Sequence, residues 1–566
     1  MRRFKAGLFL FILLSVFFQA TPVTLAQSNS VRAVAPASSA SRRAAEKITA
    51  EQLRDYLNFV SSDEMEGRDT PSRGLDLTAK FIAMNLSRWG IKPAGDEGTY
   101  FQKITLRRTT TSPTDSRVVI GGQTFNYGDG FLAAPVPTDT TGAMVFAGHG
   151  WVVNSKKINP YEGLDVKDKI IVVTGNIPVG INSFADLGGK KGVDWFNPGD
   201  YAQLHNAKAV ISLPNAQSVA TWDAVRQIQT EKGVTEVERF LTKDSVGTPT
   251  ITISPAMAVV LFQGEKPGGT DMSLSRLVEF QNKGFALDLN KTAAIKVSTK
   301  IEQVGTQNVV GLLEGSDEVL KKEYVALGAH YDHVGTGPPS NSEGRFASTK
   351  EKTDFIYNGA DDDGSGTVAV LAMAQAFASN PRPKRSILFI WHCGEEKGLW
   401  GARYYTETPS ASIGIKQIVA QLNLDMIGRS KPEGDTNPAN KELAVRDEIY
   451  VIGSKMMSTE LGELSERINA SYLNLKLNYK YDDPNDPNQF FFRSDHFHYA
   501  KNGIPIIFYT DGEHEDYHRP SDSADRIDYE QMTRITRTIY LTASAIANAP
   551  SRPRVDKKLP FDTSGN

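Results

Sequence analysis

The chain has 566 residues, which is too long for one ordinary domain and suggests two or three. Hydrophobic residues make up 40% of the chain and charged residues 23%, so its composition is that of a globular protein able to bury a sizeable core. The formal net charge of -3 excludes the polybasic character expected of a protein that binds nucleic acid or an anionic membrane.

The first 26 residues have the features of a secretory signal peptide. Three basic residues within the first five precede an apolar stretch over 8–18, and the small-x-small sequence at 24–26 predicts a cleavage site. The apolar stretch is too short to span a membrane, and no other stretch is apolar enough, so we expect no membrane span after cleavage. The protein is therefore expected to be exported, to the periplasm or to the extracellular medium.

The single cysteine, Cys393, allows no intramolecular disulfide, so an exported protein of this sequence must rely on its core. We interpret Cys393 as a small buried apolar residue rather than a nucleophile.

The segment after the signal begins without regular structure and then becomes helical. Residues 27–45 are rich in Ser and Ala with no hydrophobic period, which predicts a disordered lead. Thr49 is a suitable N-cap for a helix, and a second amphipathic helix is predicted over 75–89. Residues 61–74 between them are polar and turn-rich, and form either a solvated loop or a loop near a site.

A change in sequence pattern from about residue 142 to 263 predicts a separate small domain inserted into the chain. Short β-rich pieces recur there, separated by glycine, proline and asparagine turns. His149 and His205 lie in this segment away from any acid cluster, so we interpret them as ordinary structural or surface residues.

From about residue 287 strands alternate with helices, which predicts a largely parallel sheet covered on both faces. The predicted strands cover 324–329, 387–393, 418–424, 448–452 and 505–509, and the predicted helices 366–379, 458–468 and 529–547. The charged, proline-bearing tail from residue 550 is expected to be flexible.

Histidines and acids gather at the ends of these predicted strands. Seven of the nine histidines fall between residues 330 and 518, and ligands of open α/β sheets bind beyond the carboxyl ends of the strands. The clusters are His330-Tyr331-Asp332, the three acids 361–363 before a helix, Glu395-Glu396, Asp425, and the segment 516–522 with His518. Each cluster alone has an ordinary explanation, such as a helix cap or a polar turn.

Together these clusters supply two histidines and three or four carboxylates. Mixed nitrogen and oxygen ligands suit zinc, and a carboxylate-rich set suits a pair of divalent ions about 3.5 to 4 Å apart. In such a site one of the two adjacent glutamates can bind a metal while its neighbour takes a proton from water.

The order of these motifs resembles the M28 family of zinc-dependent aminopeptidases. The motifs are HYD, GADDDGSG, GEEKGL, NLDMIG and SDHFHYAKNGIPIIFYTDGEHEDYHRPSD, and the inserted segment resembles a protease-associated domain. The resemblance implies an α/β fold, with a mixed, mostly parallel sheet flanked by helices and an inserted small β-rich domain. The implied boundaries are a catalytic domain over 46–135 and 266–549, an inserted domain over 136–265, and a flexible tail over 550–566.

Carried over to this sequence, the resemblance implies two zinc ions. His330 and Asp425 would hold one ion, Glu396 and His518 the other, and Asp362 both. Glu395 would be the general base, Asp332 would orient His330, and Tyr517 would stabilise the oxyanion. The implied reaction is removal of N-terminal residues from peptide substrates, by hydroxide held between the two ions.

Other readings of the same sequence stay open. A carboxypeptidase or dipeptidase would need a cation for the terminal carboxylate, for which Arg403, Arg429 and Arg493 are candidates. A glutaminyl cyclase-like relative and a non-catalytic receptor-type relative are the remaining alternatives, although none of the implied ligands is missing. The inserted domain would cover the cleft and restrict substrate length, or bind a partner, and the sequence assigns no oligomeric state.

Overall fold

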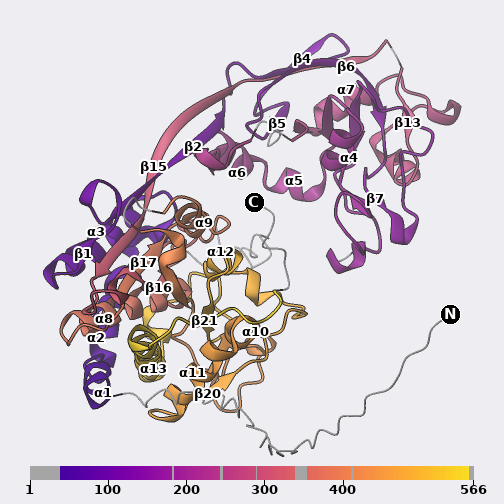
Figure 1. Ribbon diagram of the computed structural model, residues 1–566. Helices are drawn as coiled ribbons and strands as arrows, with labels where there is room; N and C mark the ends of the chain where they lie inside the picture. The colour runs from indigo at the N-terminus through magenta and orange to yellow at the C-terminus, as the bar shows by residue number, and fades with distance from the viewer. Residues whose placement is uncertain are drawn as a thin grey trace, which may run out of the picture.

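The computed structural model describes residues 38–559, except 182–183, 243–246, 289, 338–353 and 410–412. The predicted signal peptide, residues 27–37 of the predicted lead and the last seven residues of the predicted tail lie outside this range. The chain forms two lobes joined by a pair of long strands (Figure 1). Among the described residues, no helix combines the length and the apolar character needed to cross a membrane.

The main lobe is built on a ten-stranded sheet whose four central strands are parallel. These central strands, in spatial order, are β17 (Ser386–His392), β16 (Tyr324–His330), β18 (Ile418–Leu424) and β21 (Ile506–Thr510). All four are buried along their whole length, as expected of parallel strands covered on both faces, which read as continuous apolar runs.

The flanking strands make the sheet less parallel than the sequence predicts. The strands on one side are β15 (Thr299–Leu313), β2 (Phe101–Thr111), β11 (Val234–Val237) and the short β1 (Lys92–Pro93), and on the other β19 (Glu448–Ile452) and β20 (Lys476–Asn478). All of these pair antiparallel with their neighbours except β19 with β20. The mostly parallel character therefore holds for the centre of the sheet only, because the period of the apolar residues does not encode strand direction.

Helices cover both faces of this sheet, and alternate side chains of each central strand enter two different cores. Ile387, Phe389 and Trp391 of β17 face one core, whereas Leu388 and Ile390 face the other. The first core is closed by α1 (Ser39–Ala45), α2 (Ala50–Val60), α3 (Arg73–Arg88), α8 (Gly366–Ala378), α11 (Thr459–Ala470) and α13 (Tyr529–Asn548). The second is closed by α9 (Trp400–Glu407), α10 (Ser454–Met457) and α12 (His496–Lys501).

The second lobe has its own nine-stranded sheet and its own core. Its strands, in spatial order, are β4 (Gln123–Asn126), β3 (Arg117–Ile120), β14 (Thr292–Val297), β6 (Thr138–Phe146), β8 (Ile170–Val173), β10 (Ala209–Ser212), β12 (Thr250–Ile253) and β5 (Phe131–Ala133), with β13 (Phe285–Ala286) beside β6. The sheet thus draws strands from both sides of the predicted inserted domain, 136–265. The boundaries differ because β3, β4 and β14 add antiparallel edges to the β-rich centre.

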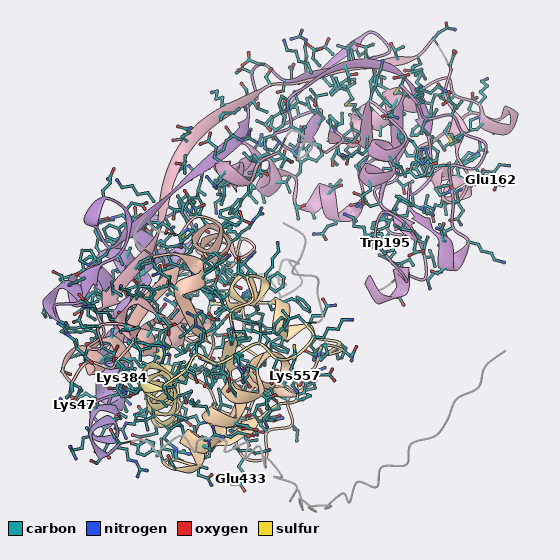
Figure 2. All side chains as sticks on the ribbon, viewed as in Figure 1. Lys47, Glu162, Trp195, Lys384, Glu433 and Lys557 are labelled. Carbon is teal, nitrogen blue, oxygen red and sulfur yellow. The ribbon has the colours of Figure 1, made fainter. Side chains whose placement is uncertain are left out.

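Helices α4 (Pro198–Leu204), α5 (Ala216–Ala220), α6 (Trp222–Gln227) and α7 (Pro255–Phe262) belong to the same lobe. A small two-stranded sheet of β7 (Val152–Val153) and β9 (Trp195–Phe196) completes it. Trp195, labelled in Figure 2, stacks on Trp151 there, with ring centroids 6.2 Å apart.

The two lobes are connected by one continuous ladder, which we call the arm. It consists of β2 and β15, paired antiparallel from Phe101↔Val309 to Thr111↔Thr299. The ladder begins within the main sheet and runs out to the second lobe (Figure 1). The chain between these two strands also returns to the arm once, because β11 pairs with β2 before the chain re-enters the second lobe.

Two segments expected to lack structure are ordered against the main lobe. Residues Ser39–Ala45, predicted as part of a disordered lead, form α1, with Ala44 and Ala45 buried and Arg42 donating to the carbonyl of Ser471. In the tail, Arg552 pairs with Glu323 at 2.6 Å, and apolar side chains near the end of the described chain pack on the second core. Contacts with distant parts of the chain, which local composition does not reveal, stabilise both segments.

Candidate metal centre

The predicted site residues lie together at the carboxyl ends of the central strands. His330 is the last residue of β16, Glu395 and Glu396 follow β17, and Asp425 follows β18 directly. Asp362 lies in the turn before α8, and His518 lies in the loop after β21. Adjacent parallel strands end at the same edge of the sheet, so their following residues converge there.

Asp362 lies between the two predicted histidines. Its Oδ1 is 3.2 Å from Nε2 of His330, and its Oδ2 is 3.1 Å from Nε2 of His518. His330 Nε2 is also 3.6 Å from Oδ1 of Asp425, and His518 Nε2 is 3.0 Å from Oε2 of Glu396. The structure thus brings all five predicted ligand residues together, with Asp362 shared between two pairs.

The donor atoms fit metal ions. Two groups of side chains each place ligand atoms within 4.8 Å of one another: His333, Asp362, Glu396 and His518 form one, and His330, Asp363 and Asp425 the other. His333 Nδ1, Glu396 Oε1 and His518 Nε2 are buried and make no hydrogen bond. Buried polar atoms without partners are costly, and a cation bound between them would satisfy all three.

Asp363, the residue after Asp362, has a different environment. Its Oδ2 accepts from the backbone N–H of His330 at 3.1 Å, and its Oδ1 accepts from Gly366 at 2.9 Å and Met426 at 3.3 Å. These three bonds tie the end of β16 to the turn before α8. The carboxylate of Asp363 is therefore engaged by the backbone, whereas that of Asp362 faces the histidines.

Glu395 is largely buried beside this group, with its side chain 11% exposed. Its Oε2 lies 4.0 Å from Nε2 of His330, and its backbone N–H donates to Oδ1 of Asp332 at 3.2 Å. Burial raises the pKa of the Glu395 carboxyl well above its ordinary value, and the nearby Glu396 and Asp425 carboxylates add to this, although His330 opposes it. A carboxyl with these neighbours can exchange a proton within the site.

The predicted orientation of His330 by Asp332 involves the backbone as well as the side chain. His330 Nδ1 lies 3.1 Å from the carbonyl oxygen of Asp332 and 3.7 Å from its Oδ1. A proton on Nδ1 donated to this carbonyl leaves the lone pair of Nε2 facing Asp362 and Asp425. The carboxylate of Asp332 accepts instead from the hydroxyl of Thr70 and from the backbone of Glu395.

Glu396 and His518 each stabilise the charged form of the other when no metal is bound. Burial disfavours the charged form of His518, but Glu396 and Asp362 outweigh it and raise the pKa of His518 to about 11. Burial and Asp362 act to raise the pKa of Glu396, yet His518 and His333 together lower it to about 2. A protonated His518 thus stands where a cation would neutralise the same acids.

Tyr517 packs directly on His518, with ring centroids 4.0 Å apart and planes inclined by 23°. Burial raises the pKa of its phenol well above the ordinary value, and the Asp362 and Glu396 carboxylates add to the effect. The hydroxyl of Tyr517 therefore remains a hydrogen-bond donor at neutral pH.

Several residues that support the site were not identified from the sequence. Arg68 and Thr70 come from the polar loop 61–74, which therefore lies near the site. Ser494 donates to Asp425 Oδ2 at 2.6 Å, and both oxygens of Asp522 accept from the backbone of the 361–362 turn. The only sequence signal for these contacts was the abundance of polar residues at strand ends.

His333 is the other residue that sequence reasoning missed. It lies one residue beyond Asp332 and is fully buried against Glu396, with Nδ1 2.7 Å from Oε1. Cys393 is buried as predicted, and burial raises the pKa of its thiol.

About half of the chain is similar in sequence to curated aminopeptidases. Leucine aminopeptidase 2 of Arthroderma otae is 26% identical over 294 residues, which are 47% of this chain and 51% of that protein. Aminopeptidase YwaD of Bacillus subtilis is 26% identical over 285 residues, 49% of this chain and 52% of that protein. The chain thus spans about half the length of these curated relatives.

Among solved structures, an aminopeptidase from Aneurinibacillus sp. strain AM-1 aligns with a TM-score of 0.49 and 19% identity, over 92% of this chain and 98% of that chain. The family model described as Peptidase family M28 matches residues 308–543. This matched segment contains all the residues of the candidate metal centre except Arg68 and Thr70, so the centre lies in a segment similar to the M28 peptidases.

Proposed function

We propose that this protein is an exported di-zinc aminopeptidase that removes N-terminal residues from peptides. In this proposal His330, Asp362 and Asp425 bind one ion, and Glu396, His518 and Asp362 the other. The observation that carries it is the position of Asp362, whose two carboxylate oxygens lie 3.2 and 3.1 Å from two different histidines. The match of residues 308–543 to peptidase family M28 and the aminopeptidase relatives support the same reading.

The residues around the ions would divide the chemistry between them. Two bound zinc ions supply a lowered pKa for water at the site and polarisation of the scissile carbonyl. Glu395 takes the proton of the attacking water and delivers it to the nitrogen of the leaving amine. Tyr517, whose phenol stays protonated, donates a hydrogen bond to the carbonyl oxygen as it gains negative charge.

The three arginines that are candidates for binding a terminal carboxylate each have an acid partner within the protein. Arg403 pairs with Glu407 at 2.9 Å, Arg429 with Asp516 at 2.8 Å, and Arg493 with Glu513 at 2.6 Å. Each of these cations is thus neutralised by an acid within the protein. The terminal carboxylate of a substrate would therefore compete with these acids for the cations.

The test is mass spectrometry of one peptide and its N-acetylated copy after incubation with the purified protein, with and without a chelator. We expect stepwise loss of N-terminal residues from the free peptide only, and no cleavage with chelator or with the Glu395→Gln variant. Loss of residues from the other end of both peptides would replace the aminopeptidase by a carboxypeptidase. No cleavage of either peptide would favour a glutaminyl cyclase or a receptor.

Export is the second part of this proposal, and it rests on the basic and apolar pattern of residues 1–26. Expression of the full-length chain in a bacterial host, followed by N-terminal sequencing of the protein outside the cytoplasm, tests it. We expect the mature chain to begin at Gln27, and an uncleaved chain in the cytoplasm would refute export.

The second lobe would restrict the length of the substrate, because it is held to the catalytic lobe by the arm. Thr111 and Thr299 are directly opposite each other at the end of the arm, so an Asn-Gly turn can join them in place of residues 112–298, which comprise the second lobe and β11. We expect the shortened enzyme to cleave long peptides relatively faster than the full chain does. An unchanged ratio of kcat/KM for long and short peptides would refute this role.

A further inference from the structure

His333 is the one histidine of the metal centre to which the motif analysis gives no role. It is fully buried, and its Nδ1 lies 2.7 Å from Oε1 of Glu396 and 3.7 Å from Oδ2 of Asp362. It therefore stands beside the same two acids that His518 contacts from the loop after β21.

These short distances are not hydrogen bonds. No hydrogen bond is made by Nδ1 of His333, Oε1 of Glu396 or Nε2 of His518. Each of these atoms nevertheless lies within about 3 Å of a carboxylate oxygen or a ring nitrogen of another of these side chains. Nitrogen and oxygen ligands of tetrahedral zinc, at bond lengths near 2.0 Å, lie about 3.3 Å from one another. His333 Nδ1 and His518 Nε2 lie 3.7 and 3.1 Å from the same oxygen, Oδ2 of Asp362. They lie 2.7 and 3.0 Å from the two different carboxylate oxygens of Glu396, so all four separations are near that value.

The ring of His333 is held in one orientation by the residues around it. Its backbone N–H donates to the carbonyl of Arg68 at 3.2 Å. Gly359 lies against the ring so closely that a Cβ there would be 2.5 Å from it, and the ring meets that of His518 edge to face at 5.5 Å. Nε2 has no hydrogen-bond partner among the described residues, so the tautomer of His333 is not fixed from that side.

We propose that His333 is a fourth protein ligand of the ion held by Asp362, Glu396 and His518. This inference rests on the two-ion site of the proposed function. It makes the two ion positions chemically unequal. One has a complete tetrahedral set of protein ligands, as structural zinc sites do, and the other has only three, as catalytic sites do.

The second ion position, which shares Asp362 with the first, has fewer protein ligands. His330, Asp362 and Asp425 are the free donors there, because Asp363 is engaged by three backbone N–H groups. The three-ligand position keeps a coordination place for water or for the substrate carbonyl. The four-ligand position should bind its ion more tightly and fill first.

Metal binding tests this inference without reference to activity. Zinc affinities of the wild type and of the His333→Ala, His333→Asn and His333→Cys variants are measured by chelator competition, with elemental analysis of the bound zinc. We expect the wild type to bind one ion much more tightly than the second. His333→Ala and His333→Asn should lose that difference, with at least a tenfold weaker first ion. His205→Ala, in the second lobe, is the matched control and should behave like the wild type.

Cobalt substitution separates a ligand from a residue that only positions Glu396. Thiolates bind divalent cobalt, so His333→Cys should give a sulfur-to-cobalt charge-transfer band that the wild type and His333→Asn lack. Asn can still hydrogen-bond to Glu396, so a wild-type affinity in His333→Asn would overturn the inference. Absence of the charge-transfer band in a folded, cobalt-loaded His333→Cys protein would overturn it as well. Peptide cleavage in the wild type remains a separate result, so failure of the inference and of the proposed function can be told apart.

Discussion

Replacing Arg68 by methionine should destabilise the main lobe and weaken metal binding at the same time. Arg68 is fully buried, and its guanidinium donates four hydrogen bonds to backbone carbonyls: Tyr331 at 3.0 Å, Val60 at 2.7 Å, Asn358 at 2.7 Å and Gly359 at 2.8 Å. Three of these carbonyls lie in the segments that carry His330, His333 and Asp362. One side chain therefore holds together the loops that carry both proposed ion positions.

The expected loss of unfolding free energy follows from the hydrogen bonds that the Arg68→Met substitution removes. Each hydrogen bond from a charged donor is worth about 1.5–3 kcal/mol, and removing one member of a buried charged network typically costs about 3–5 kcal/mol after water re-enters. Burial lowers the pKa of Arg68, but the carboxylates of Asp332, Asp362, Asp363 and Asp522 oppose this. Without the cation these acids repel one another, so we expect Arg68→Met to lose about 4 kcal/mol of unfolding free energy.

Urea unfolding of the metal-free protein and chelator competition for zinc measure the two effects separately. Zinc affinity should fall by about 10- to 100-fold, as for loss of residues that orient metal ligands. Arg537→Met is the matched control, because Arg537 also donates to backbone carbonyls, those of Glu46 and Ile48, away from the site. It should cost about 1–2 kcal/mol and leave zinc affinity unchanged.

An unfolding free energy of Arg68→Met within about 1 kcal/mol of the wild-type value, together with an unchanged zinc affinity, would refute this role of Arg68. The role is also refuted if Arg537→Met weakens zinc binding as much as Arg68→Met does.

Three further predictions concern the metal centre directly. Glu395→Gln should keep fold and bound zinc but lose about 3 or more orders of magnitude in kcat, because the amide cannot accept the proton; near-wild-type turnover would exclude the general-base role. Asp362→Asn should weaken both ions, since one neutral amide replaces two anionic donors; two tightly bound zinc ions by elemental analysis would contradict the shared position. Because the pKa of His518 is raised to about 11, zinc must displace its proton, so affinity should rise by about tenfold per pH unit between pH 7 and 9. The raised pKa of His518 also stabilises the metal-free fold. This stabilisation is fully present below pH 6.5 and is lost as the pH rises toward 11. Calorimetry that shows no proton release on zinc binding would refute both the pH dependence of the zinc affinity and this stabilisation.

The strands, and the convergence of the candidate ligand residues at their ends, could be predicted because their signals are local. Ile387 to Trp391 form a continuous apolar run that ends at two acids, and such a run identifies both a buried strand and the edge at which it stops. The choice among the acids 361–363 needed the motif resemblance. In the structure Asp361 accepts from Gly428, Asp363 accepts from three other backbone groups, and only Asp362 faces the two predicted histidine ligands.

The supporting residues could not be predicted because their partners are distant in sequence. Arg68 lies in a polar loop, where a cation is ordinarily solvated, and it is buried only because carbonyls from three separate segments surround it. His333 follows the strand end, where the alternation of strand side chains no longer fixes their direction. The boundaries of the second lobe depend on β3 and β14, which are far apart along the chain and yet pair in one sheet.

The arm has a consequence for how the chain reaches its native state. Thr111 and Thr299 lie at one end of the ladder of β2 and β15, and in an unfolded chain the long intervening segment makes the encounter of these two strands entropically costly. A second lobe that folds first holds its two ends side by side, so the later pairing resembles the closing of a short hairpin. Early folding of the second lobe would therefore accelerate assembly of the main lobe, and destabilised variants of its separate core should slow the refolding of the main lobe, whose core shares no residue with it.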